Sequence, residues 1–210
     1  MLTLETERLL YAPTPIAVMR ERLLRSDFLA DLPLGSSPSH PGGGCLRVRF
    51  PEEWPGEDAR GVLPIWIARA ERSPDPGPWC GGVAVRRQDS LAVASMGFKS
   101  PPDATGTVEI GYAVNASVRG LGYATEMATA LAAWALDQPG VRRVTAECLE
   151  TNVASARVLE KSGFRRLGRH RSEDGDVLLW ERHPLGTDRE PAVAPDGAGV
   201  DPGGERSEPG

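Results

Sequence analysis

The segment from Val108 to Leu136 constrains the fold most, because it joins a two-faced strand through a glycine-containing turn to a long helix. It reads VEIGYAVNASVRGLGYATEMATALAAWAL. Alternation of side chains predicts a strand over 108–114. One face is bulky, with Val108, Ile110, Tyr112 and Val114, and the other is nearly bare, with Glu109, Gly111 and Ala113. A bare face with one acid lets a ligand approach the backbone, although a solvent-exposed face with an incidental glutamate fits the same pattern.

The turn from Arg119 to Ala124 has the features of an anion-binding site. Glycines at 120 and 122 allow the backbone to turn sharply and to point successive N–H groups outward, and the N-terminus of the following helix adds roughly half a positive charge. Phosphate is the natural ligand of such a turn. The sequence lacks the third spaced glycine of a dinucleotide fingerprint and the Gly-Lys-Ser/Thr of a Walker loop. Taken alone, the motif also fits an ordinary turn or another nucleotide fold.

The chain around this segment predicts a mixed α/β fold of the α+β class. Two β-rich runs, 82–87 and 91–98, flank Gln88-Asp89-Ser90 and predict a hairpin that leads into the strand at 108–114. After the helix at about 122–136, we expect a strand, a helix and two more strands, at 141–149, 152–162, 164–170 and 176–182. This alternation predicts a β-α-β unit with parallel neighbouring strands.

The first third of the chain predicts fewer regular elements. A strand at 6–12 precedes a helix with apolar residues at Ile16, Met19, Leu23 and Leu24. Turn-forming residues dominate from Leu32 to Pro55, which predicts an extended loop that could border a substrate cleft. A second helix is expected at 58–71, with apolar residues Val62, Ile65, Trp66 and Ala70, and it ends at the prolines of SPDPGP.

The last 26 residues differ in composition from the rest of the chain. From Leu185 to Gly210 there are six acidic and two basic residues among many prolines and glycines, and these supply −4 of the formal charge of −5. We therefore expect a domain at 1–184 and a disordered acidic tail at 185–210. The near-neutral remainder gives no electrostatic argument for a nucleic-acid or membrane partner.

The spacing of the cysteines and the length of the apolar runs argue against a disulfide-bonded, metal-binding or membrane-spanning protein. Cys45, Cys80 and Cys148 show no metal-ligand spacing, so we expect free thiols, no disulfide and no metal. The chain shows no basic-then-apolar leader and no apolar run long enough to cross a bilayer. The sequence therefore predicts a cytoplasmic protein.

The order of strand, Arg-x-x-Gly-x-Ala turn, long helix, strand, Asn152, short helix and Gly163-Phe164 resembles the GNAT superfamily of N-acetyltransferases. Three further stretches, ETERLL, GFKSPPD and TNVASARVLEKSGFRRLG, look like the branch that acetylates the N-terminal alanine or serine of ribosomal proteins. The resemblance covers about 4–182 and is densest over 95–168. It implies a GNAT fold with a central mixed sheet of about six to seven strands and helices on both faces.

The resemblance also implies the roles of individual residues. The turn would bind the pyrophosphate of acetyl-CoA through Arg119, Gly120, Leu121, Gly122, Tyr123 and Ala124. Glu109 stands where relatives carry a general base, although an ion pair or an orienting role also fits, and the backbone near Ala113 or Val114 would stabilise the oxyanion. Many members carry a tyrosine as general acid where this chain has Leu159, so the general acid stays open.

Asn152 and Ser155 are the nearest polar candidates to hold the CoA thiol or pantetheine. Asn152 is equally a good helix N-cap with Ser155 in the first turn. Of the aromatic residues, Trp54 and Trp66 are candidates to touch an acceptor, whereas Tyr112, Trp134 and Trp180 are expected to pack in the core.

The implied activity is direct transfer of the acetyl group of acetyl-CoA to a primary amine in a ternary complex. The acceptor would be a protein N-terminus or a small molecule, with aminoglycosides and polyamines as alternatives. A different class of function is a regulator that binds acyl-CoA without turnover; Glu109 argues against it and Leu159 argues for it. A homodimer is left open.

Overall fold

The computed structural model describes residues 1–72 and 77–184 of the 210-residue chain. The predicted acidic tail, 185–210, lies outside the described residues, so the domain division at 184 stays a prediction. The elements in chain order are β1 (Leu4–Glu5), β2 (Leu9–Pro13), α1 (Ile16–Leu24), β3 (Phe28–Leu34), β4 (Gly44–Phe50), α2 (Glu57–Arg60), α3 (Leu63–Arg72), β5 (Gly81–Arg86), β6 (Leu91–Phe98), β7 (Thr107–Val114), the 3-10 turn η1 (Ala116–Val118), α4 (Tyr123–Leu136), β8 (Arg143–Leu149), α5 (Val153–Lys161), β9 (Arg165–Ser172) and β10 (Gly175–Arg182).

The strands form one mixed sheet, in the order β1-β2-β5-β6-β7-β8-β10-β9. The hairpin of β3 and β4 joins this sheet through a single parallel position, Arg49 opposite Leu91. The predicted mixed fold is confirmed. The described sheet has ten strands where about six to seven were expected, because β1 adds to its edge and the β3–β4 hairpin branches from β6.

The segment from Leu32 to Pro55, predicted to be an extended loop, contains most of the β3–β4 hairpin. Seven positions pair, from Phe28 opposite Phe50 to Leu34 opposite Gly44. Val48 and Phe50 are buried on its inner face, and the Phe50 ring stacks on Phe28 at 5.1 Å and meets Trp54 edge-on at 4.8 Å. Burial of these alternating apolar residues outweighs the local preference for turns. Trp54 is only 1% exposed, so the suggestion that it touches an acceptor is wrong.

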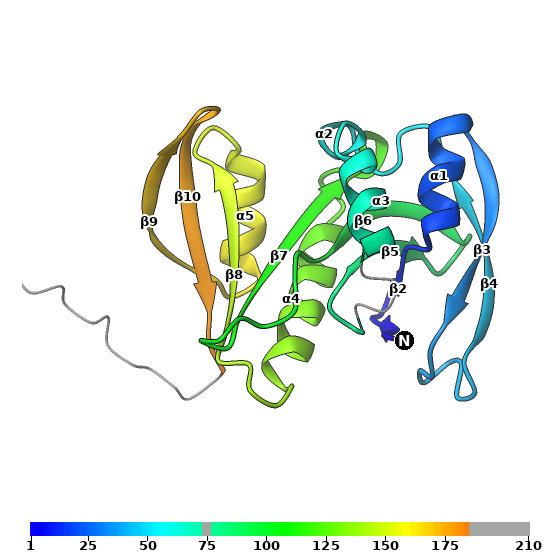
Figure 1. The fold of residues 1–210 in the computed structure, drawn as a ribbon, viewed down its shortest axis with the longest axis horizontal. Coiled ribbons are helices and arrows are strands. Elements are labelled where there is room, and N and C mark those ends of the chain that lie inside the picture. The colour runs from blue at the N-terminus through cyan, green and yellow to red at the C-terminus, as the bar shows by residue number, and fades with distance from the viewer. Residues whose placement is uncertain (73–76, 185–210) are drawn as a thin grey trace, which may run out of the picture.

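Helices cover both faces of the sheet, as predicted (Figure 1). On one face, Leu9 and Tyr11 of β2 pack in the same core cluster as Met127 and Leu131 of α4. On the other face, alternate strand residues pack against Val18 of α1 and against the β3–β4 hairpin. None of the helices in the described ranges is both long and apolar enough to span a membrane.

Two helix predictions were wrong in detail. In α1, Met19 is buried as expected, but Leu23 and Leu24 are 54% and 80% exposed, because the helix buries Val18 and Arg22 instead. The single helix expected at 58–71 is divided into α2 and α3, and α3 buries Leu63 and Ile67 while leaving Ile65 exposed. The apolar residues in both segments fit more than one helical stripe, and contact with the neighbouring elements selects the stripe.

The predicted β-α-β unit of β8, α5 and β9 is not made of neighbouring strands. β10 lies between β8 and β9 and is antiparallel to both. The unit β7-α4-β8 does have parallel neighbours. The predicted hairpin of β5 and β6 and the alternation of β7 are confirmed, since Val108 and Ile110 are buried while Glu109 and Gly111 face the other way.

Candidate active site

The sheet opens between β7 and β8. These two strands pair at three positions only, and the last is Glu109 opposite Thr145. Beyond it β7 runs on to Val114 and β8 to Leu149 without pairing to each other. Figure 1 shows the two strands meeting at one end and diverging into a V, with α5 beside β8. Past Glu109 and Thr145, the backbone groups of the two strands that face each other are therefore not joined by ladder hydrogen bonds.

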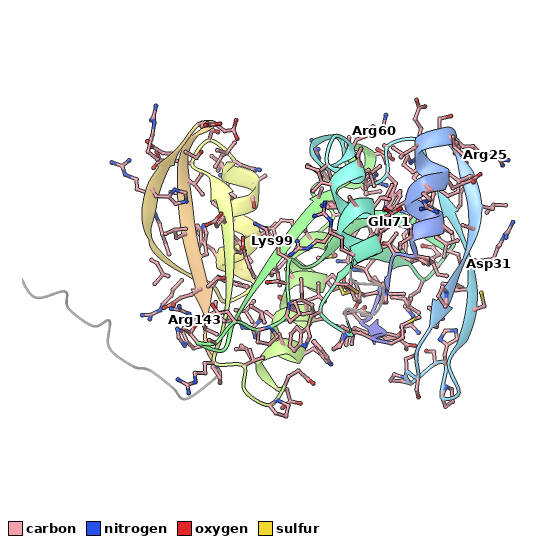
Figure 2. All side chains as sticks on the ribbon, viewed as in Figure 1. Arg25, Asp31, Arg60, Glu71, Lys99 and Arg143 are labelled. Atoms are coloured by element: carbon pink, nitrogen blue, oxygen red, sulfur yellow. The ribbon has the colours of Figure 1, made fainter. Side chains whose placement is uncertain are left out.

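Glu109 lies on the bare face of β7, at the last position where β7 pairs with β8. Its carboxylate forms an ion pair with Lys99 Nζ, and the Lys99 side chain also passes over Gly111. Figure 2 shows Lys99 beside β7 and Arg143 near the closed end of the V. The expected face of one acid and two small residues is therefore present, and a primary ammonium group already contacts the acid.

The backbone N–H and C=O groups of successive β7 residues point alternately toward β6 and toward the V between β7 and β8. Asn115 N–H donates to Val93 O and Lys99 N–H donates to Glu109 O, so the odd-numbered positions of β7 bond to β6. By the same alternation the N–H of Val114 points away from β6, toward the V. Of the two predicted backbone donors, Val114 therefore has the suitable direction, whereas the N–H of Ala113 is directed to β6. The Val114 carbonyl accepts from Arg119 Nε at 3.3 Å.

The turn after β7 has the geometry expected of an anion-binding loop. Gly120 and Gly122 have φ of +79° and +83°, the left-handed region that favours glycine. Gly122 is the N-cap of α4, and among the described residues no side chain caps this helix end. The first N–H groups of a helix have no intrahelical acceptor, so those of Tyr123, Ala124 and Thr125 are left for a ligand. Leu121 at the turn's tip is 50% exposed. These residues fit a pyrophosphate group.

The ETERLL stretch holds this turn in place, a role that the sequence did not show. Glu126, in the first turn of α4, accepts from Thr6 Oγ1 at 2.6 Å, from Arg8 N at 2.9 Å and from Arg8 Nε at 2.6 Å. Burial alone would raise the pKa of Glu126, but the hydrogen bonds from Thr6 and Arg8 lower it. Arg8 also donates to Leu121 O at 2.9 Å and its guanidinium lies over the Tyr123 ring.

The start of α5 brings the remaining predicted residues together. Asn152 Oδ1 accepts from Ser155 N at 3.0 Å, so Asn152 is the N-cap, as one of the two interpretations required. Ser155 Oγ lies 2.9 Å from the phenol oxygen of Tyr112. Tyr112, expected to be a core residue, is only partly buried and spans from β7 to α5. Leu159 is fully buried in the core and leaves no hydroxyl donor at its position.

A cavity of about 520 Å³ borders the end of β7 on the side of the β4–α2 connection. Pro51, Glu52, Glu53, Arg60 and Ala116 line it. Glu53 accepts from the backbone N–H of Ser117 at 2.9 Å and from its hydroxyl, which ties this connection to η1. The prediction that the segment before Pro55 borders a cleft is thus consistent with the structure, although the segment is held by hydrogen bonds.

Comparison with known proteins agrees with this geometry. The family model described as an acetyltransferase (GNAT) domain matches residues 46–165. The uncharacterized N-acetyltransferase YjdG of Bacillus subtilis is 35% identical over 137 residues, which cover 64% of this chain and 82% of that protein.

Two solved structures share the fold. A GNAT-family acetyltransferase from Bacillus anthracis has a TM-score of 0.56 at 19% identity, covering 87% of this chain and 98% of its own. The ribosomal-protein-S5-alanine acetyltransferase from Vibrio fischeri has a TM-score of 0.56 at 14% identity, covering 91% and 100%. These structures show the fold, whereas the family is established by the family model, which matches more than half of the sequence, and by the 35% identity to YjdG. The chain belongs to the GNAT acetyltransferase family.

Proposed function

We propose that this acetyltransferase moves the acetyl group of acetyl-CoA to a primary amine, by direct attack within a ternary complex. The observation that carries the proposal is the V between β7 and β8, with an anion-binding turn at its open end. A thioester anchored by its pyrophosphate on that turn has beside it the stretch of β7 that does not pair with β8, along which the pantetheine arm can lie. Val114 supplies the backbone N–H for the developing oxyanion.

The phosphate end of acetyl-CoA is held by the turn from Arg119 to Ala124. Its backbone N–H groups and the α4 dipole attract the pyrophosphate, and Arg8 lies against the same turn. Asn152 shapes the start of α5 by capping, and Ser155 presents a hydroxyl there.

Glu109 is the proposed base. A lysine-type amine of pKa near 10.4 is less than about a thousandth neutral at pH 7, and an α-amine of pKa 7.7–8.0 is about a tenth neutral, so both gain from a proton acceptor. The ion pair with Lys99 supports this role, because it shows that a primary ammonium group can reach the carboxylate. The acceptor amine displaces Lys99, gives its proton to Glu109 and attacks the carbonyl carbon.

The bonds in this reaction balance without a further reactant. The nitrogen–carbon bond forms as the carbon–sulfur bond breaks, and CoA leaves as a thiolate stabilised by a hydrogen bond from Ser155. Glu109 takes one proton from the ammonium group before the attack and releases it to solvent, the nitrogen loses its second proton to solvent through Glu109 after the nitrogen–carbon bond forms, and the thiolate takes one proton from solvent. A donor hydroxyl at position 159 is not required.

The acceptor class is proposed from the resemblance to enzymes that acetylate ribosomal-protein N-termini. The fold alone is compatible with other amines, since solved structures that share it include a chimera of a spermidine acetyltransferase, with a TM-score of 0.59 at 10% identity. A protein N-terminus is the leading candidate and polyamines and aminoglycosides are the competing ones.

The test combines binding and turnover. Calorimetry with CoA measures the cofactor site, and CoA release is then measured with acetyl-CoA and a panel of peptides with free N-termini, polyamines and aminoglycosides. Glu109→Gln should lower kcat by about 10²–10⁴, while Glu160→Gln on the exposed side of α5 should leave kcat unchanged. Unchanged turnover in Glu109→Gln would refute the base. CoA binding without release on any amine would favour the regulator, the candidate that the buried Leu159 supports.

A further inference from the structure

Two hydroxyl groups from opposite sides of the V meet at the start of α5. The phenol oxygen of Tyr112, on β7, lies 2.9 Å from Ser155 Oγ and 3.2 Å from Ser155 O. The two residues are 43 positions apart in the chain. Tyr112 belongs to the stretch of β7 that no longer pairs with β8, so its side chain bridges the two halves of the divided sheet.

The hydroxyl hydrogen of Ser155 can rotate, whereas the hydrogen of its backbone N–H is fixed at the start of the helix. Asn152 already accepts from the Ser155 N–H, which fixes the first turn of α5. Each of the two hydroxyls carries one hydrogen, so two arrangements are available. Either Tyr112 donates to Ser155 Oγ, or Ser155 donates to Tyr112 while Tyr112 donates to the Ser155 carbonyl. Only the first leaves the serine hydrogen for another acceptor.

We infer that Tyr112 is a positioning residue for acyl transfer: it donates to Ser155 Oγ and so directs the serine hydrogen to the sulfur of the departing CoA thiolate. The inference rests on the proposed function. Negative charge developing on sulfur attracts the serine hydrogen and selects the first arrangement, and donation from the phenol strengthens the serine as a donor. Tyr112 thus supports the leaving group from β7, whereas the family tyrosine would do so from the position of Leu159.

The raised pKa of Tyr112 suits a residue that donates a hydrogen bond and keeps its proton. Burial raises the pKa of Tyr112 to about 12, with a hydrogen bond to Ser155 opposing the shift and the nearby Cys148 thiol adding to it. The phenol therefore keeps its proton at neutral pH and transfers none to the thiolate. Cys148 on β8 is a titratable group that acts on Tyr112, and it has to be accounted for in any titration.

The test is an equilibrium titration that needs no acceptor amine. CoA is bound to the full chain, the thiolate absorbance is followed against pH, and a complex with desulfo-CoA is subtracted to remove the protein's own tyrosines and cysteines. The bound thiol of the wild type should have a lower pKa than that of Tyr112→Phe by about one unit, a tenfold change in the ionisation constant. Ser155→Ala should raise the pKa by at least as much.

Two further variants distinguish a positioning role of Tyr112 from a non-specific loosening of the structure. Tyr11→Phe removes a fully buried phenol hydroxyl that donates to Cys80 O at 2.9 Å, far from α5 in sequence, and should leave the bound thiol's pKa unchanged. Tyr112→Phe made in the Ser155→Ala background should add no shift, because the positioned hydroxyl is already gone. Turnover of acetyl-CoA should fall in Tyr112→Phe through kcat with little change in KM.

The outcomes distinguish the inference from the proposed function. A bound thiol with the same pKa in Tyr112→Phe and wild type, while Ser155→Ala raises it, overturns the positioning role alone. An equal effect of Tyr112→Phe with and without Ser155 overturns it as well. No shift in Ser155→Ala overturns the leaving-group role of Ser155 and with it this inference, and a wild type that does not bind CoA overturns the proposed function itself.

Discussion

Replacing Gly122 by alanine tests the anion-binding turn with a single methyl group. Gly122 has φ +83°, and a Cβ there would lie 3.3 Å from Arg8 Nη2. The left-handed conformation costs an L-residue about 1–2 kcal/mol. If Arg8 moves away, its 2.9 Å bond to Leu121 O weakens, which adds about 1 kcal/mol. We expect a loss of about 2–3 kcal/mol in the free energy of unfolding, or a turn that changes shape.

A matched variant separates backbone strain from ligand binding. Gly140 has the same φ, +83°, but a Cβ there has open space, and it lies in the connection after α4. Gly140→Ala should therefore lose about 1–2 kcal/mol of stability and keep its affinity for CoA. Gly122→Ala should weaken CoA binding by about tenfold or more, because misplaced N–H groups no longer converge on one phosphate.

The assay is urea unfolding of both variants, followed by calorimetric titration with CoA under conditions where each is folded. A folded Gly122→Ala protein with wild-type affinity for CoA would refute the placement of the pyrophosphate. Equal losses of affinity in both variants would also refute it, since the effect would then follow stability.

Other predictions concern groups around this centre. Glu126→Gln should lose about 1–2 kcal/mol in urea unfolding, since the 2.6 Å hydrogen bond from the Arg8 guanidinium loses its negatively charged acceptor. Leu159→Tyr should not raise turnover and should lose about 1–3 kcal/mol, because the family tyrosine would enter a fully buried site; a gain in kcat would contradict this. Burial opposes ionisation of Glu5, but hydrogen bonds from Ser37, Ser39 and His40 lower its pKa to about 2. Its contribution to stability is present above about pH 4.5 and is lost as pH falls toward 2, so acid unfolding should begin at higher pH in Glu5→Ala.

The sequence predicted the elements whose signal is local. Alternation over Val108 to Val114 located β7 and its bare face, and the two glycines located the turn, because positive φ and side-chain alternation depend on neighbouring residues only. The β3–β4 hairpin was missed for the opposite reason. Its stability comes from contacts of Phe28, Val48 and Phe50 with one another and with the sheet, and prolines and glycines gather at its tip.

The missing parts of the site are all long-range contacts. Thr6 and Glu126 are 120 residues apart, and Tyr112 and Ser155 are 43 apart, so no periodicity in the sequence joins them. The position of β10 between β8 and β9 is a similar case, since strand order depends on how the whole sheet assembles. The ETERLL stretch was noticed by resemblance, but only the structure assigns Thr6 and Arg8 to the support of α4.

Because β7 pairs with β8 at three positions only, the sheet has fewer stabilising hydrogen bonds, and the two strands stay apart where the proposed site lies. Past Glu109 and Thr145, both strands continue with backbone groups that a longer ladder would have joined, each bond worth about 0.5–1.5 kcal/mol. A variant engineered to extend the pairing of these strands should be more stable but inactive if the proposed function is correct, because the proposal places the acetyl group between them.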